Sequence, residues 1–205
     1  MVVGITGNVG SGKTTVVGFL EEAGWQSINV DELAQEIIHS DSQIQIQIRD
    51  CFGNEYFDKQ GILKRKELGQ KVFSDATLLK QLDDIVWPVL LNTLQSQIHQ
   101  INKDQSHFTA VDMAVLFEAE CQSLFDCILV VMASEKNRRF RLKTLRQWSL
   151  TEINQRMRSQ LDDAVKIQEA HYVIWNDGSL PDLSEKTMAF IHWINQQAVM
   201  IRKES

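Results

Sequence analysis

The stretch GNVGSGKTT at residues 7–15 constrains the fold more than any other part of the sequence. It fits the pattern G-x-x-x-x-G-K-[S/T] through Gly7, Gly12, Lys13 and Thr14. The apolar run MVVGIT before it is typical of a strand, and VVGFLEEAG after it is typical of an amphipathic helix. A strand, a glycine-rich turn and a helix in this order predict a phosphate-binding loop, or P-loop, on an α/β sheet.

The glycines of such a loop let consecutive N–H groups approach phosphate oxygens, and the start of the following helix adds its positive end. We expect Lys13 to reach the terminal phosphates of ATP and the Thr14 hydroxyl to complete the shell of a Mg²⁺ ion. The alternative, a flexible glycine loop with a chance Lys-Thr pair, leaves the flanking strand and helix unexplained. The predicted nucleotide-binding residues are Gly7, Asn8, Val9, Gly10, Ser11, Gly12, Lys13, Thr14 and Thr15, with Asn176 added as a contact for the base.

Short apolar runs alternate with longer amphipathic segments along the rest of the chain. Besides MVVGIT, the runs that look like strands are WQSINV, HFTAVDMAV, DCILVVMA and HYVIWN. This alternation predicts an α/β fold with a parallel sheet covered by helices. A nearly all-helical segment at about 32–106 is longer than a connection needs, which predicts an inserted lobe in one 205-residue domain.

Composition excludes several classes of protein. Hydrophobic residues make up 43% of the chain and no apolar run approaches the length of a membrane span, so we expect a cytoplasmic protein with no membrane partner. A net charge of −6 argues against a nucleic-acid partner. Cys51, Cys121 and Cys127 have no CxxC spacing, which favours buried thiols over a zinc site or disulfides. The oligomeric state stays open.

Two aspartates follow predicted strands. Asp31 ends the run SINVD, where it would stand at the mouth of the sheet and accept the proton of an attacking hydroxyl. It could also cap the next helix, and the two roles can coexist. Asp112 follows HFTAV and suits a residue that orients Mg²⁺ through water, with a capping or turn aspartate as the alternative.

A basic cluster, EKNRRFRLKTLRQWSLTEINQRMRSQ, occupies residues 135–160. Ser134 is placed to begin one helix, and Ser149 with Glu152 forms a capping box for a second. Two short arginine-rich helices predict a mobile lid at about 138–160, in which Arg139, Arg146 or both would neutralise charge on the transferring phosphoryl group. The alternative is a solvated basic helix face.

The order of these motifs resembles the dephospho-coenzyme A kinase family over nearly the whole chain. The segments that carry the resemblance are GITGNVGSGKTTV, NVDELA, CFG at 51–53, GILKRKELGQKVF at 61–73, WP at 87–88, VDMAVLFE at 111–118, the arginine-rich lid and NDG at 176–178. The combination of G-x-L-x-R-x-x-L with L-F-E is far more specific than the P-loop alone.

The resemblance implies phosphorylation of the ribose 3′-hydroxyl of dephospho-CoA by ATP, the last step of coenzyme A synthesis. It further implies that Asp31 is the general base, that Arg146 is a lid arginine and that the helical lobe helps to bind the acceptor. The acceptor-binding residues expected on this basis are Asp31, Arg65, Asp112 and Glu118, and the catalytic residues are Lys13, Asp31 and Arg146.

The chain departs from the family pattern at several positions. It has Asn29 where the first Asp of D-A-D is usual, Trp87 where H-P has its His, Ala114 where P-L-L-F-E has its Pro, and Gln147 where a lid R-D pair has its Asp. None of these changes removes Lys13, and we expect an active enzyme whose substrate affinity and lid closure are affected.

Two alternatives remain at the sequence level. Another P-loop kinase, acting on a nucleotide, nucleoside or shikimate-like alcohol, would share the loop, lid and base. A GTPase switch would need an N-K-x-D motif after a strand, and the nearest match, residues 102–105 (NKDQ), has Gln where the Asp should be.

Overall fold

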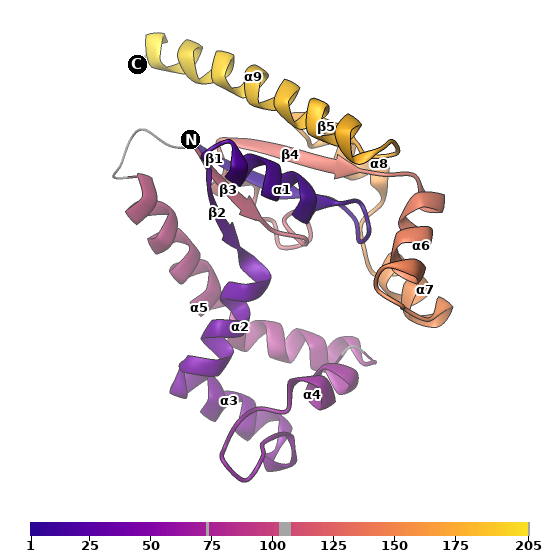
Figure 1. Cartoon of the computed structure of the whole chain (residues 1–205). Helices are drawn as coiled ribbons and strands as arrows, with labels where there is room; N and C mark the ends of the chain where they lie inside the picture. The colour runs from indigo at the N-terminus through magenta and orange to yellow at the C-terminus, as the bar shows by residue number, and fades with distance from the viewer. Residues whose placement is uncertain (73, 103–107, 205) are drawn as a thin grey trace. The chain divides into compact units, whose positions relative to one another are not determined.

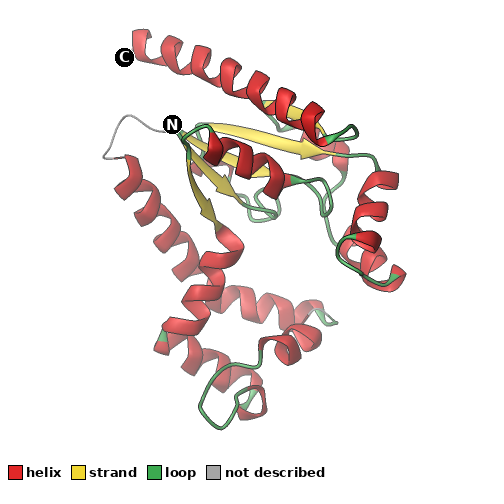
Figure 2. Cartoon of the chain, in the orientation of Figure 1, coloured by secondary structure: helices red, strands yellow, loops and turns green. Residues whose placement is uncertain are grey.

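The computed structural model describes residues 1–72, 74–102 and 108–204, and these contain a five-stranded sheet (Figures 1 and 2). Each paired strand runs parallel to its neighbours, in the order β2-β3-β1-β4-β5. The prediction of a parallel α/β sheet is therefore confirmed. The strands are β1 (Val2–Thr6), β2 (Gln26–Asn29), β3 (Thr109–Asp112), β4 (Cys127–Met132) and β5 (Tyr172–Trp175).

Parallel pairing brings the carboxyl ends of the strands to one edge of the sheet. Asp112 at the end of β3 is level with Ile5 of β1 on one side and with Asn29 of β2 on the other. The chain leaves β1 after Thr6 and enters the P-loop at this edge. Ligands of open α/β sheets bind outside such an edge, so the topology places Asp112 beside the start of the loop.

The core of the sheet is continuous and apolar. Every residue of β1 and of β4 is buried, as expected of central parallel strands covered on both faces. Helices α1 (Lys13–Glu22) and α9 (Leu180–Glu204) lie side by side and contribute Leu20 and Phe190 to the same apolar cluster. A Cβ at Gly4 would come within 2.6 Å of Leu116, so the absence of a side chain there permits packing on β1.

Three helices and a 3₁₀ turn complete this part of the chain. Helices α6 (Glu135–Thr144), α7 (Leu150–Arg158) and α8 (Asp163–Gln168) lie between β4 and β5, and η2 (Gln122–Leu124) precedes β4. The predicted capping box is present, because Glu152 N–H donates to Ser149 Oγ at 3.2 Å and Ser149 N–H donates to Glu152 Oε2 at 2.9 Å. Ser134 caps α6 as expected.

Residues 30–100 form a second compact unit. It contains α2 (Val30–Ser40), α3 (Ser42–Phe52), η1 (Asn54–Tyr56), α4 (Arg65–Val72) and α5 (Ala76–Asn102). Asp41 caps α3 by accepting from the N–H of Gln43 and of Ile44. Residues 73 and 103–107 lie outside the described residues, and so does most of the NKDQ segment. All of them except residue 107 fall within the predicted lobe at about 32–106.

No described helix is both long enough and apolar enough to cross a membrane. The described cysteine thiols are free. The prediction of buried thiols is confirmed for Cys121 and Cys127 and is wrong for Cys51, which is exposed. Burial raises the pKa of the Cys121 thiol, and burial together with the Asp126 carboxylate raises the pKa of Cys127 to about 12.

We predict that a thiol reagent at pH 8 modifies Cys51 rapidly, and modifies Cys121 and Cys127 only after unfolding. A thiol with a raised pKa holds little thiolate at this pH, and burial also blocks access. Timed alkylation with mass spectrometry checks this prediction. Cys51→Ser is the control and should remove the fast phase, whereas fast modification of Cys127 in the native protein would contradict the described core.

Candidate active site

The loop after β1 turns at glycines with positive φ, namely Gly7 (144°), Gly10 (80°) and Gly12 (98°). A Cβ at Gly7 would lie 2.1 Å from the backbone oxygen of Val131, and one at Gly12 would lie 2.2 Å from Nδ2 of Asn176. Both the backbone conformation and the space therefore require glycine. The resulting loop forms a tight cradle of main chain at the sheet edge.

The start of α1 is suited to an anion. Gly12 occupies the N-cap position without a side-chain cap, and no acidic residue lies in the first turn. The positive end of the helix dipole therefore faces the cradle without a carboxylate to compensate it. Thr14 and Thr15 are exposed there, and Lys13 Nζ donates to the carbonyl oxygen of Gly7 at 3.0 Å.

Ser11 adds a second indication that this cradle holds a polar group. Its hydroxyl is buried, and it has no hydrogen-bond partner among the described residues. Buried polar atoms are nearly always paired in folded proteins. The uncompensated helix start, the glycine cradle and this hydroxyl together fit the phosphates of a nucleotide.

The oxygen ligands predicted for Mg²⁺ are the Thr14 hydroxyl and the Asp112 carboxylate. Asp112 is half-buried at the end of β3, and Thr14 lies in the first turn of α1. Within the described ranges no group of three or more His, Cys, Asp or Glu side chains is arranged to hold a metal ion. A hydroxyl and a carboxylate fit Mg²⁺, which keeps several waters and commonly takes its remaining ligands from substrate phosphates.

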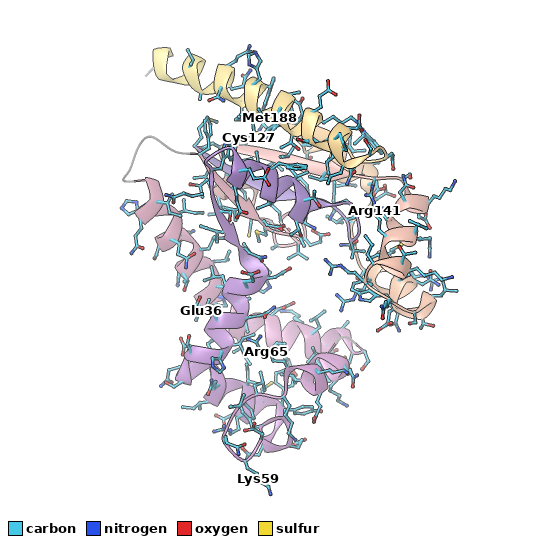
Figure 3. All side chains as sticks on the ribbon, in the orientation of Figure 1. Glu36, Lys59, Arg65, Cys127, Arg141 and Met188 are labelled. Atoms are coloured by element: carbon cyan, nitrogen blue, oxygen red, sulfur yellow. The ribbon has the colours of Figure 1, made fainter. Side chains whose placement is uncertain are left out.

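Arg141 of α6 contacts the P-loop (Figure 3). The sequence patterns did not single out this residue. Its Nη1 donates to the carbonyl oxygens of Gly10 at 3.3 Å and Ser11 at 3.4 Å. Its Nη2 donates to the backbone oxygen of Asn176 at 2.7 Å and to Oδ1 of Asn176 at 3.2 Å. Arg138 and Leu142 are the buried residues of this helix, and because this burial is seen only in the structure, the sequence offered no local signal for Arg141.

Asn176 lies beneath the loop. Its side chain is buried and Nδ2 donates to the carbonyl oxygen of Ser11 at 2.7 Å. Asp177 beside it accepts from the N–H and hydroxyl of Ser134 and from Asn137, each at 2.8 Å. Burial pushes the pKa of Asp177 upward, but these hydrogen bonds outweigh burial and hold the pKa below its ordinary value. The segment after β5 thus fixes both the P-loop and the start of α6.

Arg146 lies in the turn between α6 and α7, is exposed, and has its guanidinium carbon 5.8 Å from the centre of the Trp148 ring. Arg156 stacks on the same ring at 4.6 Å. Arg139 donates to Glu135 at 2.6 Å and to Asn154 at 2.7 Å, which links α6 to α7. The arginines of this segment therefore have different environments.

Glu118 is tied to α8. Its Oε1 accepts from Lys166 Nζ at 2.8 Å and from the N–H of Leu161 at 3.2 Å. Burial alone would raise the pKa of Glu118, but the bonds from Lys166 and from backbone N–H groups lower it below the ordinary value of 4.5. Its predicted contact with the acceptor remains a prediction.

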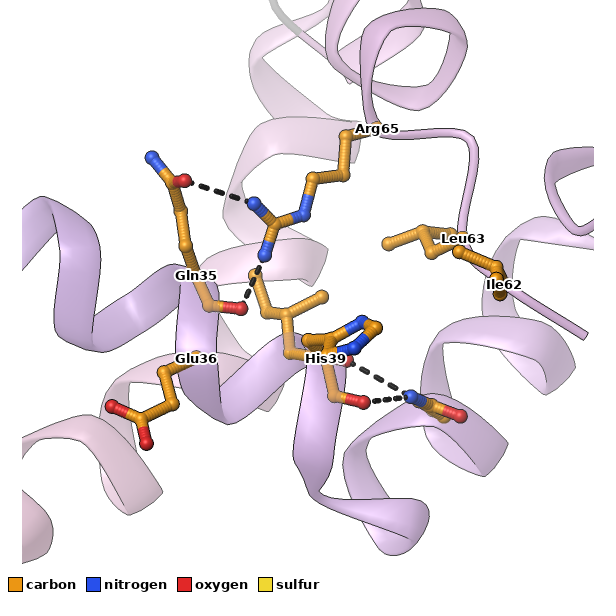
Figure 4. A pocket seen from close by; sticks show the side chains of 8 residues that line it. Gln35, Glu36, His39, Ile62, Leu63 and Arg65 are labelled. Atoms are coloured by element: carbon orange, nitrogen blue, oxygen red, sulfur yellow. Dashed lines mark hydrogen bonds between the residues drawn. The ribbon is translucent and has the colours of Figure 1, made fainter.

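The remaining predicted residues belong to the second compact unit. Arg65, at the start of α4, donates to the side-chain oxygen of Gln35 at 2.9 Å and also to its backbone oxygen (Figure 4). Both residues line a cavity of about 420 Å³ together with Glu36, Ile38, His39, Gln45, Ile62 and Leu63. Asp31 precedes Gln35 by one turn of α2, so the two lie on the same side of that helix.

Helix α2 begins at Val30, so Asp31 lies in its first turn. A carboxylate in this place also complements the helix dipole. The structure thus gives Asp31 a favourable local environment that is independent of any catalytic role.

A sequence model of the family described as dephospho-CoA kinase matches residues 1–182. The chain belongs to this family.

Curated dephospho-CoA kinases share this similarity over almost their whole length. The enzyme of Carboxydothermus hydrogenoformans is 30% identical over 190 residues, which cover 93% of this chain and 92% of the relative. The enzyme of Enterococcus faecalis is 30% identical over 196 residues, covering 96% of both.

Solved structures agree on the fold. A protein from Thermus thermophilus superposes with a TM-score of 0.79 at 29% identity, covering 94% of this chain and 96% of that one. The dephospho-CoA kinase of Campylobacter jejuni gives 0.66 at 21% identity, over 94% of this chain and 96% of that one. A shikimate kinase from Acinetobacter baumannii, in complex with shikimate, superposes with a TM-score of 0.52 at 16% identity, covering 93% of this chain and 92% of that one. This similarity shows the fold alone.

The structure shows the effect of two of the departures from the dephospho-CoA kinase pattern. Ala114 contributes its carbonyl oxygen to the Thr6 hydroxyl at 3.2 Å, a bond that any residue type can make. Gln147 has a φ of 55°, a left-handed conformation that Asp tolerates better than Gln. The first departure is therefore neutral for this contact, and the second strains the turn that carries Arg146.

We predict that Arg141→Ala weakens the binding of a non-hydrolysable ATP analogue by about ten-fold or more, because about 1.4 kcal/mol corresponds to ten-fold and charge-assisted hydrogen bonds reach this size. The carbonyls of Gly10 and Ser11 lose their shared donor in this variant. Calorimetry measures the affinity. Lys143→Ala, which removes an exposed charge from the same helix, should bind normally; equal affinities for the two variants would contradict the assigned role.

Proposed function

We propose that this protein transfers the γ-phosphoryl group of ATP to the ribose 3′-hydroxyl of dephospho-CoA, giving coenzyme A. The observation that carries the proposal is the glycine cradle at the uncapped start of α1, in a chain that the dephospho-CoA kinase family model matches over residues 1–182. The cradle supports the binding of phosphate, and membership of the family supports dephospho-CoA as the acceptor.

The P-loop binds and orients the phosphates. Backbone N–H groups of the loop other than that of Val9, which donates to Gln160, would face the phosphate oxygens. Lys13 would exchange its contact with the Gly7 carbonyl for the terminal phosphates. Thr14 and Asp112 would hold Mg²⁺, which when bound neutralises charge between the β- and γ-phosphates. Asn176 supports the loop from beneath, a role separate from the base contact expected of it.

Asp31 is the proposed general base. Its carboxylate takes the proton of the acceptor hydroxyl as the hydroxyl oxygen forms its bond to the γ-phosphorus, and the bond from that phosphorus to the bridging oxygen breaks to release ADP. Asp31 leaves the step protonated and returns the proton to water. Arg65 donates to Gln35, which lies on the same side of α2 as Asp31. Arg65 is proposed to bind the acceptor, together with Asp112 and Glu118.

Transfer with dephospho-CoA, ATP and Mg²⁺ is the direct test, with the position of the new phosphate located by mass spectrometry or NMR. We expect a strong preference for dephospho-CoA over adenosine and shikimate, and for the 3′-position. Lys13→Ala should abolish transfer while circular dichroism stays unchanged. Equal use of adenosine would sink the assignment of the acceptor, and near-normal transfer by Lys13→Ala would sink the P-loop assignment.

Asp31→Asn should lower kcat with dephospho-CoA by on the order of 10²- to 10⁴-fold, because it removes the basicity of the side chain and keeps its size. The affinity for ATP should change little. Glu32→Gln, which neutralises the neighbouring exposed carboxylate of α2, is the matched control and should remain active. A kcat of Asp31→Asn close to that of the wild type would contradict the base assignment.

Arg146→Ala should slow transfer by about 10³-fold, the lower end of what an arginine that stabilises transition-state charge supplies, with a smaller effect on ATP affinity. Its exposed place in the α6–α7 turn leaves the fold unaffected. The comparison of kcat with the binding constant for ATP checks this. Lys136→Ala, which removes an exposed cation from α6, is the control. If Arg146→Ala transfers phosphate as fast as this control, Arg146 belongs to a solvated helix face and has no role in transfer.

A further inference from the structure

The segment that leads from α7 into α8 contacts the first half of the P-loop. The Val9 N–H donates to Oε1 of Gln160 at 2.9 Å, and Nδ2 of Asn8 donates to the carbonyl oxygen of Leu161 at 3.3 Å. The same Asn8 nitrogen also donates to Oδ1 of Asp163. The predicted lid segment, about 138–160, therefore ends directly against the loop that is proposed to bind phosphate.

Two charged side chains hold this return segment in place. Glu118 accepts from the N–H of Leu161 at 3.2 Å, and the carbonyl oxygen of the same Leu161 accepts from Asn8. Arg138 of α6 pairs with Asp163 at 2.9 Å and is only 7% exposed. The backbone of Arg138 also approaches Gly10 closely, since a Cβ on that glycine would lie 3.1 Å from the Arg138 carbonyl oxygen.

The buried partner of Glu118 is Lys166 of α8. Its side chain is 0% exposed, and its ammonium lies 2.8 Å from Glu118 Oε1. A buried ammonium is tolerated only when a counter-charge and good geometry compensate for lost water. Glu118 therefore links three segments of the chain: its own segment after β3, helix α8, and the backbone of Leu161 that leads to Asn8.

We propose that the Glu118–Lys166 pair is a positioning element for the P-loop, which fixes Leu161 and Gln160 so that they hold Asn8 and Val9 in the nucleotide-binding conformation. The inference rests on the proposed binding of ATP at residues 7–15. The pair acts through Leu161, and its effect belongs to the nucleotide site. It differs in this respect from the acceptor contact that the resemblance implies for Glu118.

A double variant separates an effect on the position of the P-loop from an effect on the stability of the fold. Glu118→Leu with Lys166→Met removes both charges together, so no uncompensated charge stays buried, and such apolar replacements are often neutral or stabilising. The Leu161 N–H nevertheless loses its acceptor. Glu118→Gln with Lys166→Met, by contrast, also leaves no buried charge and keeps an oxygen that can accept from Leu161. Ile194→Ala in α9 is the control for core destabilisation, because Ile194 is buried and belongs to the cluster around α1 and α9.

The two readouts are amide hydrogen exchange of the peptide containing Val9, measured without nucleotide, and the affinity for a non-hydrolysable ATP analogue with Mg²⁺. We expect the Glu118→Leu double variant to keep its thermal midpoint, to exchange faster at Val9 and to bind the analogue about ten-fold more weakly. Glu118→Gln with Lys166→Met should bind within about three-fold of the wild type, a difference smaller than the loss of one hydrogen bond. Ile194→Ala should lower the thermal midpoint and leave both readouts unchanged.

The proposal is overturned if the Glu118→Leu double variant matches the wild type at Val9 and in affinity, or if Ile194→Ala shows the same losses. It is also overturned if the Glu118→Leu double variant changes the KM for dephospho-CoA and leaves the affinity for the analogue intact, since that pattern marks an acceptor contact. Neither readout requires phosphoryl transfer, so a failure of the proposed acceptor would leave this test interpretable.

Discussion

The hydrogen bonds to the carbonyl oxygens of Gly10 and Ser11 are the interaction on which the candidate site depends. Arg141 binds both oxygens, and Asn176 binds the second. A glycine loop has many accessible backbone conformations, and fixing them costs conformational entropy. Donors supplied from α6 and from the end of β5 select one conformation before a ligand arrives, and they do so without using the N–H groups that a phosphate requires.

Topology makes this arrangement possible. Because β4 and β5 run parallel to β1, their carboxyl ends deliver α6 and Asn176 to the same edge at which the P-loop begins. The ends of β3 and β2 meet on the other side of β1, where Asp112 lies level with Asn29. One edge of the sheet therefore holds the glycine cradle, the Asp112 carboxylate and the start of α6, although these residues are far apart in the sequence.

The predicted lid segment is joined to the P-loop near both of its ends. Arg141 donates to Gly10 near its beginning, and Gln160 at its end, with Leu161 just after it, accepts from Val9 and Asn8 respectively. Arg146, in contrast, lies exposed in the turn between the two helices, next to the positive φ of Gln147. The exposed turn with Arg146 therefore lies between two parts of the chain that hydrogen bonds anchor to the P-loop.

The sequence by itself determined the features that depend on neighbouring residues. The pattern of Gly7, Gly12 and Lys13 with its flanking strand and helix, the capping box at Ser149 and the alternation of apolar runs each arise within a few residues, from backbone sterics and side-chain periodicity. These signals were sufficient for the parallel α/β sheet and for the place of the glycine turn between β1 and α1.

Only the tertiary structure decided which side chains meet across elements. The sequence contains several arginines between 138 and 158, and nothing local distinguishes Arg141, which faces the loop, from Arg146, which is exposed. Glu118 and Lys166 are 48 residues apart, and their pairing follows from α8 packing beside β4. The physical reason is that the direction of a side chain and the burial of its charge are set by the packing of whole elements, which no short sequence window contains.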